Sequence, residues 1–521
     1  MSGNVNRNYV LIVDFGSQYT HLITRRVREL GVYSEVIPCW AGEADIRRDG
    51  LVGVILSGGP NSVYDEGAPR LPSWLPDVGV PVLGVCYGLQ AMAFHLGGEH
   101  AVARGERGGE YGPTQLERTA GDCTLLEGVS PRSTVWMSHG DRVEEMSSGF
   151  NVVGRSEPCP VAAVEDHERR WYGLQFHPEV HHSVEGRTVL SNFLFGICEA
   201  RCEWRMERFA EEMQARVAEQ VGDARVVLGL SGGVDSSVAA VLVHRAIGDR
   251  LTCIFVDNGL LRAGEADDVE ETFRDHFKID LRAVDARERF LSELEGVDDP
   301  EEKRRIIGRV FVEVFEEEAR SIPDVRFLGQ GTLYPDVIES VSPHGGPSVT
   351  IKTHHNVGGL PERLGLELVE PLRELFKDEV RELGRQLGLP EVILRRHPFP
   401  GPGLAVRSLG AVVPEDLEIL RAADLIAREE LEQSGWMDRT SQAFVVLLPV
   451  RSVGVQGDAR TYQRVCALRV VETPDFMTAD WASLPRDLLA RISNRIINEV
   501  DGINRVVYDI SSKPPATIEW E

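Results

Sequence analysis

The sequence predicts an α/β protein built from two successive parallel-sheet domains and a smaller α+β domain. Three observations predict this class. Apolar runs in the first 200 residues each end at a glycine-rich turn, a second series of such runs starts near residue 222, and the pattern changes after the turn-rich HPFPGPG at 397–403. Apolar runs without polar alternation are typical of strands buried on both faces of a parallel sheet. The length of 521 residues agrees with several domains.

The first domain is expected over residues 8–202. The runs YVLIVDFG, VGVILSGGP and VPVLGVCYG predict three strands, and the last leads into the helical pattern LQAMAFHLGG. Binding sites in parallel sheets form where strands end at their carboxyl edge. The turns after the second and third runs are therefore the first places to look for chemistry.

The second domain is expected over residues 203–397. It begins with a charged segment, 203–221, whose apolar residues recur every three or four positions and predict an amphipathic helix that links the domains. The strands ARVVLGL, LTCIFVDNG and VRFLGQGT follow, with a helix around ELFKDEVRELGRQLG. This alternation of strands and helices again predicts a parallel sheet.

The third domain is expected over residues 398–521, as an α+β unit. A helix pattern lies between residues 420 and 431, followed by the strands FVVLLPV and ALRVV, the helix RDLLARISNRIINEV and the strand NRVVYDI. Strands and helices that do not alternate regularly favour an α+β arrangement.

Composition excludes several classes of protein. The formal net charge of −26 repels polyanions, so we expect no nucleic-acid partner and no anionic membrane surface. No apolar run reaches the roughly 18 residues of a membrane span, and the first residues lack a signal-peptide pattern, so we expect a cytoplasmic protein. The eight cysteines form no CxxC pair of the kind used for zinc binding or redox chemistry. None of the lysines follows a glycine, so a Walker-type phosphate loop is absent.

A cysteine nucleophile is predicted in the first domain. Cys86 lies in GVCYG, where flanking glycines allow the sharp strand-to-helix turn of a nucleophile elbow. In QFHPE, His177 is the expected base and Glu179 the group that orients it, since alternate side chains of an extended segment share one side. The expected oxyanion hole comprises the backbone amides of Gly58, Gly59 and Tyr87. Each residue alone would more often be a buried thiol or a surface histidine.

The order SGGP, GVCYGLQ and HPE resembles the class I glutamine amidotransferases. The resemblance implies that glutamine is hydrolysed through a thioester and that ammonia is released. It also implies that Gln90, Ser138 and His139 help to hold the glutamine.

A pyrophosphate-binding loop is predicted in the second domain, where a strand, a glycine turn and a helix start follow one another in VVLGLSGGVDSS. Backbone N–H groups and hydroxyls at a helix start bind phosphate oxygens, although such a turn can also only cap a helix. The string resembles the SGGxDS loop of N-type ATP pyrophosphatases, which implies cleavage of ATP between its α and β phosphates, bound Mg²⁺, and no tightly bound organic cofactor. The implied ATP-binding residues are Ser231, Gly232, Gly233, Val234, Asp235, Ser236 and Ser237.

The acceptor remains open from these two motifs, because enzymes with this loop serve NAD, asparagine, argininosuccinate, GMP and thiolated-tRNA synthesis. Thiolation generally uses two cysteines, but residues 222–398 contain only Cys253, so we do not expect thiolated-tRNA synthesis. An amidotransferase acting on another adenylated acceptor, such as deamido-NAD, and a nucleotide-sensing scaffold without turnover are the alternatives.

The strings EEKRRIIGRVF, IKTHHNVGGLP, ELFKDEVREL, HPFPGPGLAVR and SSKPPATIEWE resemble the bacterial GMP synthetase family along nearly the whole chain. The resemblance implies amination of xanthosine monophosphate (XMP) to GMP, with glutamine and ATP as the other substrates, and a homodimer formed by the third domain. It implies a lid for adenylation with Lys352, His354, His355, Asn356, Lys377 and Asp378, the last also a Mg²⁺ ligand. It implies XMP binding by Arg304, Asp458, Lys513 and Glu519. The alternatives without a binding role are that His354 and His355 lie on the surface of a loop, that Asp458 only forms a turn, and that Glu519 is a solvent-exposed acid.

Overall fold

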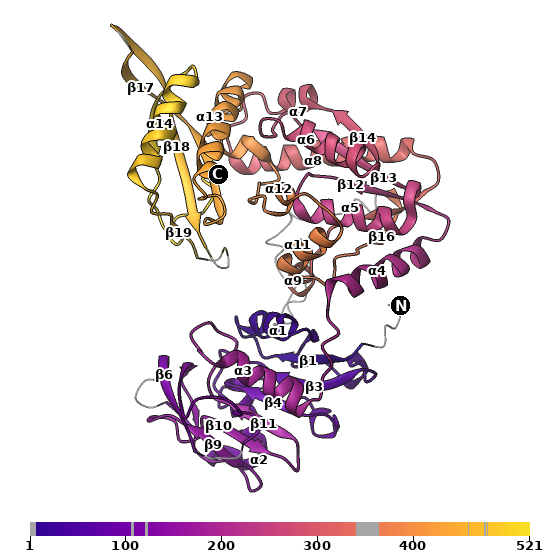
Figure 1. Ribbon diagram of the computed structural model, residues 1–521, viewed down its shortest axis with the longest axis vertical. Coiled ribbons are helices and arrows are strands. Elements are labelled where there is room, and N and C mark those ends of the chain that lie inside the picture. The colour runs from indigo at the N-terminus through magenta and orange to yellow at the C-terminus, as the bar shows by residue number, and fades with distance from the viewer. Residues whose placement is uncertain are drawn as a thin grey trace. The chain divides into compact units, whose positions relative to one another are not determined.

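The computed structural model describes residues 7–105, 109–119, 123–339, 364–456, 458–473, 476 and 478–521. The described residues form two compact units (Figure 1). One contains residues 7–212 and 335–339, and the other contains residues 213–334 and 364–521. The expected lid residues Lys352, His354, His355 and Asn356 lie outside the described residues.

The first unit is built on a nine-stranded sheet of strand order β2-β1-β3-β4-β11-β10-β9-β6-β7. The parallel part comprises β1 (Tyr9–Asp14), β2 (Tyr33–Pro38), β3 (Leu51–Leu56), β4 (Val82–Val85) and β11 (Trp171–Leu174). The antiparallel part comprises β10 (Ala163–Asp166), β9 (Asn151–Arg155), β6 (Glu110–Arg118) and β7 (Arg132–His139). The predicted parallel sheet is therefore confirmed. The sheet also has an antiparallel extension, which the sequence patterns did not predict.

Helices α1 (Thr20–Glu29), α2 (Tyr87–Gly97) and α3 (Gly186–Ser191) accompany this sheet. One apolar core joins strand residues such as Ile12, Ile55 and Val85 with helix residues such as Ile23 and Leu190. Strand β7 alternates buried and more exposed residues, as expected for an antiparallel strand with one face on the core. The parallel strands β1, β3 and β4 are buried almost throughout.

The second unit begins with a five-stranded sheet of order β14-β13-β12-β15-β16, in which every pair is parallel. The strands are β12 (Arg225–Gly229), β13 (Leu251–Asp257), β14 (Asp280–Asp285), β15 (Val325–Gly329) and β16 (Glu367–Val369). The helices of this part are α5 (Val234–Ile247), α6 (Glu265–Glu270), α7 (Arg287–Glu293), α8 (Pro300–Ser321), α11 (Lys377–Gln386) and α12 (Glu391–Leu394). The predicted helix before this sheet is α4 (Met206–Val221). Its expected apolar face is buried, at Met206, Phe209, Met213, Val217 and Val221.

The C-terminal part has the predicted α+β character. A four-stranded sheet comprises β17 (Gln442–Gln456), β18 (Ala459–Glu472), β19 (Asp480–Trp481) and β20 (Ile503–Tyr508). Strand β18 pairs antiparallel with β17 and parallel with β20. Helix α13 (Pro414–Gln433) packs against β17, and α14 (Arg486–Glu499) packs against β20.

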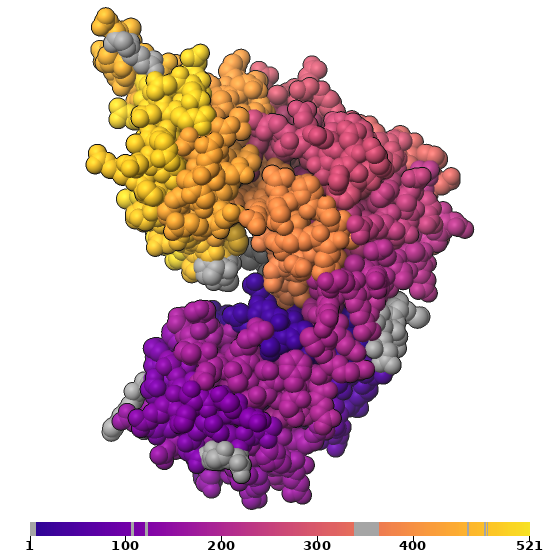
Figure 2. Space-filling model, viewed as in Figure 1, coloured from indigo at the N-terminus to yellow at the C-terminus, as the bar shows by residue number. Residues whose placement is uncertain are grey.

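One apolar core of the second unit spans both of its sheets. It contains Val227 and Leu328 of the parallel sheet together with Leu447 and Leu468 of the C-terminal sheet. On the surface, the orange and yellow C-terminal residues adjoin the magenta and pink residues of the parallel-sheet part (Figure 2). Residues on both sides of the expected domain boundary at 397/398 therefore share one core. The three-domain division stays a prediction.

Candidate functional site

Cys86 lies at the turn from β4 to α2, in a backbone conformation that few side chains adopt. Its φ is 51° and its ψ is −105°, which is the strained geometry expected of a nucleophile elbow. Its backbone N–H donates to the carbonyl of Leu174 at 2.7 Å, which ties the turn to the end of β11. The side chain is 4% exposed, and its sulfur lies 3.6 Å from the carbonyl oxygen of Ser138.

His177 follows β11 and completes a cysteine, histidine and glutamate set. Its Nδ1 lies 2.7 Å from Oε1 of Glu179, and both side chains are almost fully buried. Burial favours the neutral imidazole, but the charges of Glu179 and of the Cys86 thiolate, with hydrogen bonds to both, outweigh burial and raise the pKa of His177 well above 6.5. A cationic imidazole beside a cysteine favours the thiolate, which is the nucleophilic form of a thiol.

The two predicted oxyanion glycines adjoin this set. A Cβ on Gly58 would lie 3.1 Å from Cε1 of His177, and one on Gly59 would lie 3.3 Å from the ring of Tyr87. Within the described residues, the backbone N–H groups of Gly58 and Gly59 donate no hydrogen bond. Two free donors next to the nucleophile can stabilise the oxyanion of a tetrahedral intermediate.

The residues expected to hold glutamine lie around the same turn. Gln90 is in the first turns of α2, and its Nε2 donates to the carbonyl of Asp141 at 2.6 Å. Ser138 and His139 end β7, and Nε2 of buried His139 lies 3.4 Å from a carboxylate oxygen of Glu110. Burial would raise the pKa of Glu110, but hydrogen bonds from His139 and other neighbours hold it below the ordinary value. The structure thus brings Ser138 to Cys86, while the glutamine-binding roles stay predictions.

The glycine loop of the second unit lies between β12 and α5, as predicted. Gly232 has a φ of +70°, and the hydroxyls of Ser231 and Ser236 lie 3.0 Å apart. The Ser237 hydroxyl is buried and has no hydrogen-bond partner in the described residues. The loop is also held from outside, because Arg396 donates to the carbonyl of Gly232 at 2.9 Å. This is a formed turn at a helix N-terminus, suited to phosphate oxygens.

Lys377 meets this loop across a long sequence separation. Its ammonium lies 2.6 Å from both carboxylate oxygens of Asp235, which is in the first turn of α5. Lys377 and Asp378 open α11. The structure therefore brings one predicted adenylation residue, Lys377, to a residue of the predicted ATP loop.

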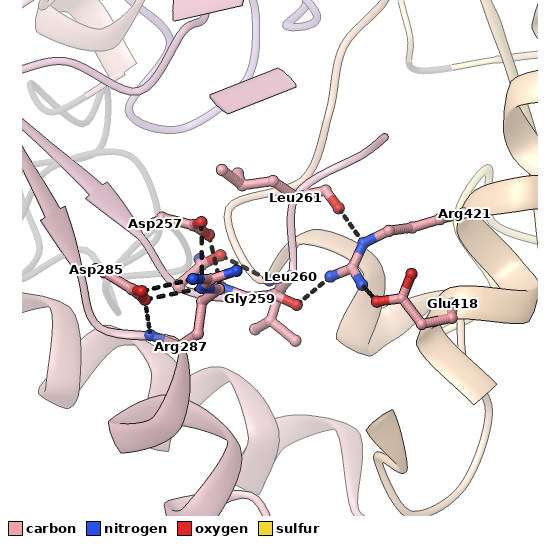
Figure 3. Close-up of polar contacts among 9 residues, drawn as sticks. Asp257, Gly259, Leu260, Leu261, Asp285, Arg287, Glu418 and Arg421 are labelled. Carbon is pink, nitrogen blue, oxygen red and sulfur yellow. Dashed lines mark hydrogen bonds and ion pairs between the residues drawn. The ribbon is translucent and has the colours of Figure 1, made fainter. Parts of the chain in front are cut away.

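A further polar group, absent from the sequence-based candidates, lies at the same edge of the parallel sheet (Figure 3). Asp257 and Asp285 end the neighbouring strands β13 and β14, and Arg287 pairs with both, at 2.8 Å from Asp285 through Nε and at 3.7 Å from Asp257. Arg421 of α13 donates to the carbonyl of Leu261 at 2.9 Å and also to that of Gly259. The signal available in the sequence was VDNG after a predicted strand, which marks a carboxyl edge but not these partners.

The residues expected to bind XMP do not all lie together. Nη2 of Arg304, on α8, donates to the main-chain oxygen of Glu521 at 2.6 Å, and Glu519 accepts from Arg407 at 2.8 Å. Lys513 donates to the carbonyl of Phe476 at 2.7 Å. The C-terminal segment therefore brings Arg304 and Glu519 into one neighbourhood.

Asp458 lies elsewhere in the second unit. It follows β17 in the turn that leads to β18 and is exposed. Within the described residues, no contact joins Asp458 to Arg304, Lys513 or Glu519.

Comparison with known proteins decides the family. The model for class-I glutamine amidotransferases matches residues 11–197, that for NAD synthase matches 206–285, and that for the GMP synthase C-terminal domain matches 429–520. The glutamine-hydrolysing GMP synthase of Nitratidesulfovibrio vulgaris is 57% identical over 98% of this chain and 99% of its own length. The chain belongs to the glutamine-hydrolysing GMP synthase family.

The same family relationship holds for distant bacteria. The GMP synthase of Aquifex aeolicus is 57% identical over 99% of this chain and all of its own length, and that of Vibrio parahaemolyticus is 56% identical over the full length of both chains. Membership of this family accounts for both candidate sites, because this one chain matches both the class-I glutamine amidotransferase model and the NAD synthase model.

Proposed function

We propose that this protein hydrolyses glutamine and uses the nitrogen, with ATP, to convert XMP to GMP, releasing AMP and pyrophosphate. The observation that carries the proposal is the coexistence of a formed cysteine, histidine and glutamate set with a formed pyrophosphate-type loop on a chain that belongs to the GMP synthase family. Ammonia is the natural nucleophile for an adenylated carbonyl, so the product of one site is a substrate of the other.

The first half-reaction proceeds at Cys86. Its sulfur attacks the amide carbon of glutamine, and His177 transfers a proton to the departing ammonia while Glu179 keeps the imidazole oriented. Gly58, Gly59 and Tyr87 provide the amides for the oxyanion. Water then hydrolyses the thioester to glutamate, with His177 acting as the base.

The second half-reaction uses the loop of residues 231–237. Its N–H groups and hydroxyls hold the ATP phosphates, and Lys377 offers a positive charge to the leaving pyrophosphate. An oxygen of the XMP base attacks the α-phosphorus of ATP, and ammonia then displaces AMP from the adenylated carbon. Arg304, Lys513 and Glu519 hold the XMP.

We propose Mg²⁺ as the ion that accompanies ATP. Magnesium usually takes one or two carboxylates together with substrate phosphates rather than a complete protein cage. Asp378 fits this pattern, and the described residues contain no group of three or more ligands suited to a metal. When bound, Mg²⁺ neutralises charge on the departing pyrophosphate.

We further propose a cytoplasmic homodimer. Val453 and Val455 of β17 and Tyr462 of β18 share one face, because Val453 pairs with Tyr462 in the strand register. All three side chains are exposed, Val455 at 75% and Tyr462 at 63%. A second copy would cover this face, which carries Asp458 at its turn.

No helix in the described residues is both long and apolar enough to cross a membrane.

The decisive experiment supplies the purified protein with ATP, Mg²⁺, glutamine and XMP, and follows GMP, AMP and pyrophosphate. Equal amounts of the three products are expected. Turnover only with deamido-NAD would select another acceptor, and nucleotide binding without turnover would select a sensing scaffold. A sedimentation experiment on the same sample gives the oligomeric state.

A variant then separates the two half-reactions. Cys86→Ala should abolish GMP formation from glutamine but keep formation from added ammonium chloride. Cys202→Ala, a change at an exposed cysteine of the same unit that lies beside Gly31, is the matched control and should keep both activities. Equal loss with both nitrogen sources in folded Cys86→Ala protein would contradict the division of labour.

A further inference from the structure

Among the described residues of the second unit, three cationic side chains are completely buried, and all of them hold the C-terminal segment. Lys303 of α8, Arg407 after the 3₁₀ turn Gly403–Val406 and Arg469 of β18 each have a side-chain exposure of 0%. The carboxylate that pairs with each of them lies within residues 509–521. Burying a charge is costly unless it is paired and hydrogen-bonded. Three such buried charges on one short segment therefore indicate that the position of this segment matters.

Lys303 satisfies all three of its donors in this place. Its Nζ lies 3.0 Å from the carbonyl of Ala405, 3.1 Å from that of Ser408 and 2.6 Å from Oε2 of Glu521. The other carboxylate oxygen of Glu521 accepts from the backbone N–H of Gly410 at 3.2 Å. Glu521 is therefore fixed by its side chain.

Glu521 in turn holds Arg304. The main-chain oxygen of Glu521 accepts from Nη2 of Arg304 at 2.6 Å, one residue along α8 from Lys303. The Arg304 side chain is 21% exposed, so part of its guanidinium can still meet a ligand. The Lys303–Glu521 pair therefore determines where Arg304 lies.

Arg407 acts on Glu519 in the same manner. Its Nε and Nη2 lie 3.1 and 2.8 Å from the two carboxylate oxygens of Glu519, a bidentate pair, and its guanidinium lies 4.1 Å above the ring of Phe444. A planar guanidinium held between a ring and a carboxylate is rigid. Gln442 adds a third hydrogen bond to Glu519 at 2.6 Å.

We propose that Lys303 and Arg407 are positioning residues for the acceptor nucleotide. They do not touch it, but they hold Glu521 and Glu519 so that Arg304 and Glu519 are in place before the nucleotide arrives. Fixing binding groups in advance removes the ordering cost from the binding step. This inference rests on the proposed function, which assigns Arg304 and Glu519 to the nucleotide.

The test uses the full-length protein with ammonium chloride as nitrogen source, so that the glutaminase step is bypassed. Lys303→Met removes the buried charge with a side chain of similar length, and Glu521→Gln removes the opposite charge. Each should raise the KM for XMP at least tenfold and change the KM for ATP less than twofold. The double variant should resemble the single variants, because both remove the same contact.

Neighbouring residues provide the controls. Arg305 follows Arg304 on the same helix, but its side chain is 64% exposed and pairs only with Glu302 in the described residues, so Arg305→Met should leave both KM values unchanged. Arg407→Met should also raise the KM for XMP, and Arg407→Lys should recover part of the loss, since lysine restores the charge but not the bidentate geometry.

Three results would overturn the proposal: an unchanged KM for XMP in folded variants, an equal rise in the KM for ATP, or additive effects in the double variant. If Lys303→Met does not fold, Glu521→Gln tests the same contact from the other side. Failure of the proposed function is distinguishable, because then the wild-type protein forms no GMP from XMP. Failure of this inference alone leaves the wild-type conversion of XMP to GMP intact.

Discussion

Replacing Glu179 by glutamine tests the electrostatic role of the buried His177–Glu179 pair. The change removes one negative charge but keeps an oxygen that can accept the hydrogen bond from Nδ1, 2.7 Å away. Both side chains are nearly inaccessible to solvent, at 3% and 0% exposure, so screening is weak. Two unit charges about 4 Å apart attract by about 4 kcal/mol at an effective dielectric constant of about 20.

That attraction stabilises the imidazolium, which in the proposed mechanism donates the proton to the departing ammonia. Since about 1.4 kcal/mol corresponds to a tenfold change in rate, a loss of about 4 kcal/mol predicts a glutaminase kcat/KM lower by up to about 10³-fold. The assay measures glutamate release with glutamine as substrate, beside GMP formation with ammonium chloride. The second activity should be unchanged.

Glu185→Gln is the matched control. Glu185 lies near the same segment but binds the backbone and hydroxyl of Ser130 instead of a histidine. It should retain wild-type glutaminase activity. A folded Glu179→Gln protein whose kcat/KM stays within threefold of wild type would refute the electrostatic reasoning.

Three further predictions follow from particular contacts. Lys377→Met leaves Asp235 without its cation, so pyrophosphate release with XMP and ammonium should slow by about 10²–10³-fold while basal glutaminase activity is kept; unaltered pyrophosphate release would contradict the role. Gly88→Ala places a Cβ 2.5 Å from the carbonyl oxygen of Leu56, and overpacking of this kind should cost about 1–3 kcal/mol, seen as a lower thermal midpoint; an equal midpoint would show that α2 can shift freely. Because the folded-state pKa of His177 lies above 6.5, its stabilising contribution is full below pH 6.5 and is lost as pH rises through the folded-state pKa; denaturation of His177→Gln should lack this pH dependence, and curves parallel to wild type would count against it.

Local sequence predicted the elements that short-range rules govern. The apolar runs around Val10, Val54 and Leu83 became buried parallel strands, and the spacing from Met206 to Val221 became the apolar face of α4. Cys86 and the loop at 231–237 could be found for the same reason, since a strand, a glycine turn and a helix start are adjacent in the chain.

The antiparallel extension of the first sheet could not be read in this way. The sheet neighbours are β11, β10, β9, β6 and β7 in that order, which differs from their order in the chain. Strands β6, β7 and β9 are partly exposed and mixed in polarity, so their pattern indicates a strand weakly and its partner not at all.

By itself, the sequence determined the two chemistries of this protein, because each depends on a few consecutive residues around a strand end. Only the tertiary structure decided which charged residues serve a site and which face water. In EEKRR, Lys303 is fully buried against Glu521, Arg304 is partly buried, and Arg305 is solvent-exposed, although the three are adjacent in one helix. Their burial depends on segments that lie about a hundred or more positions along the chain, and no local pattern encodes that packing.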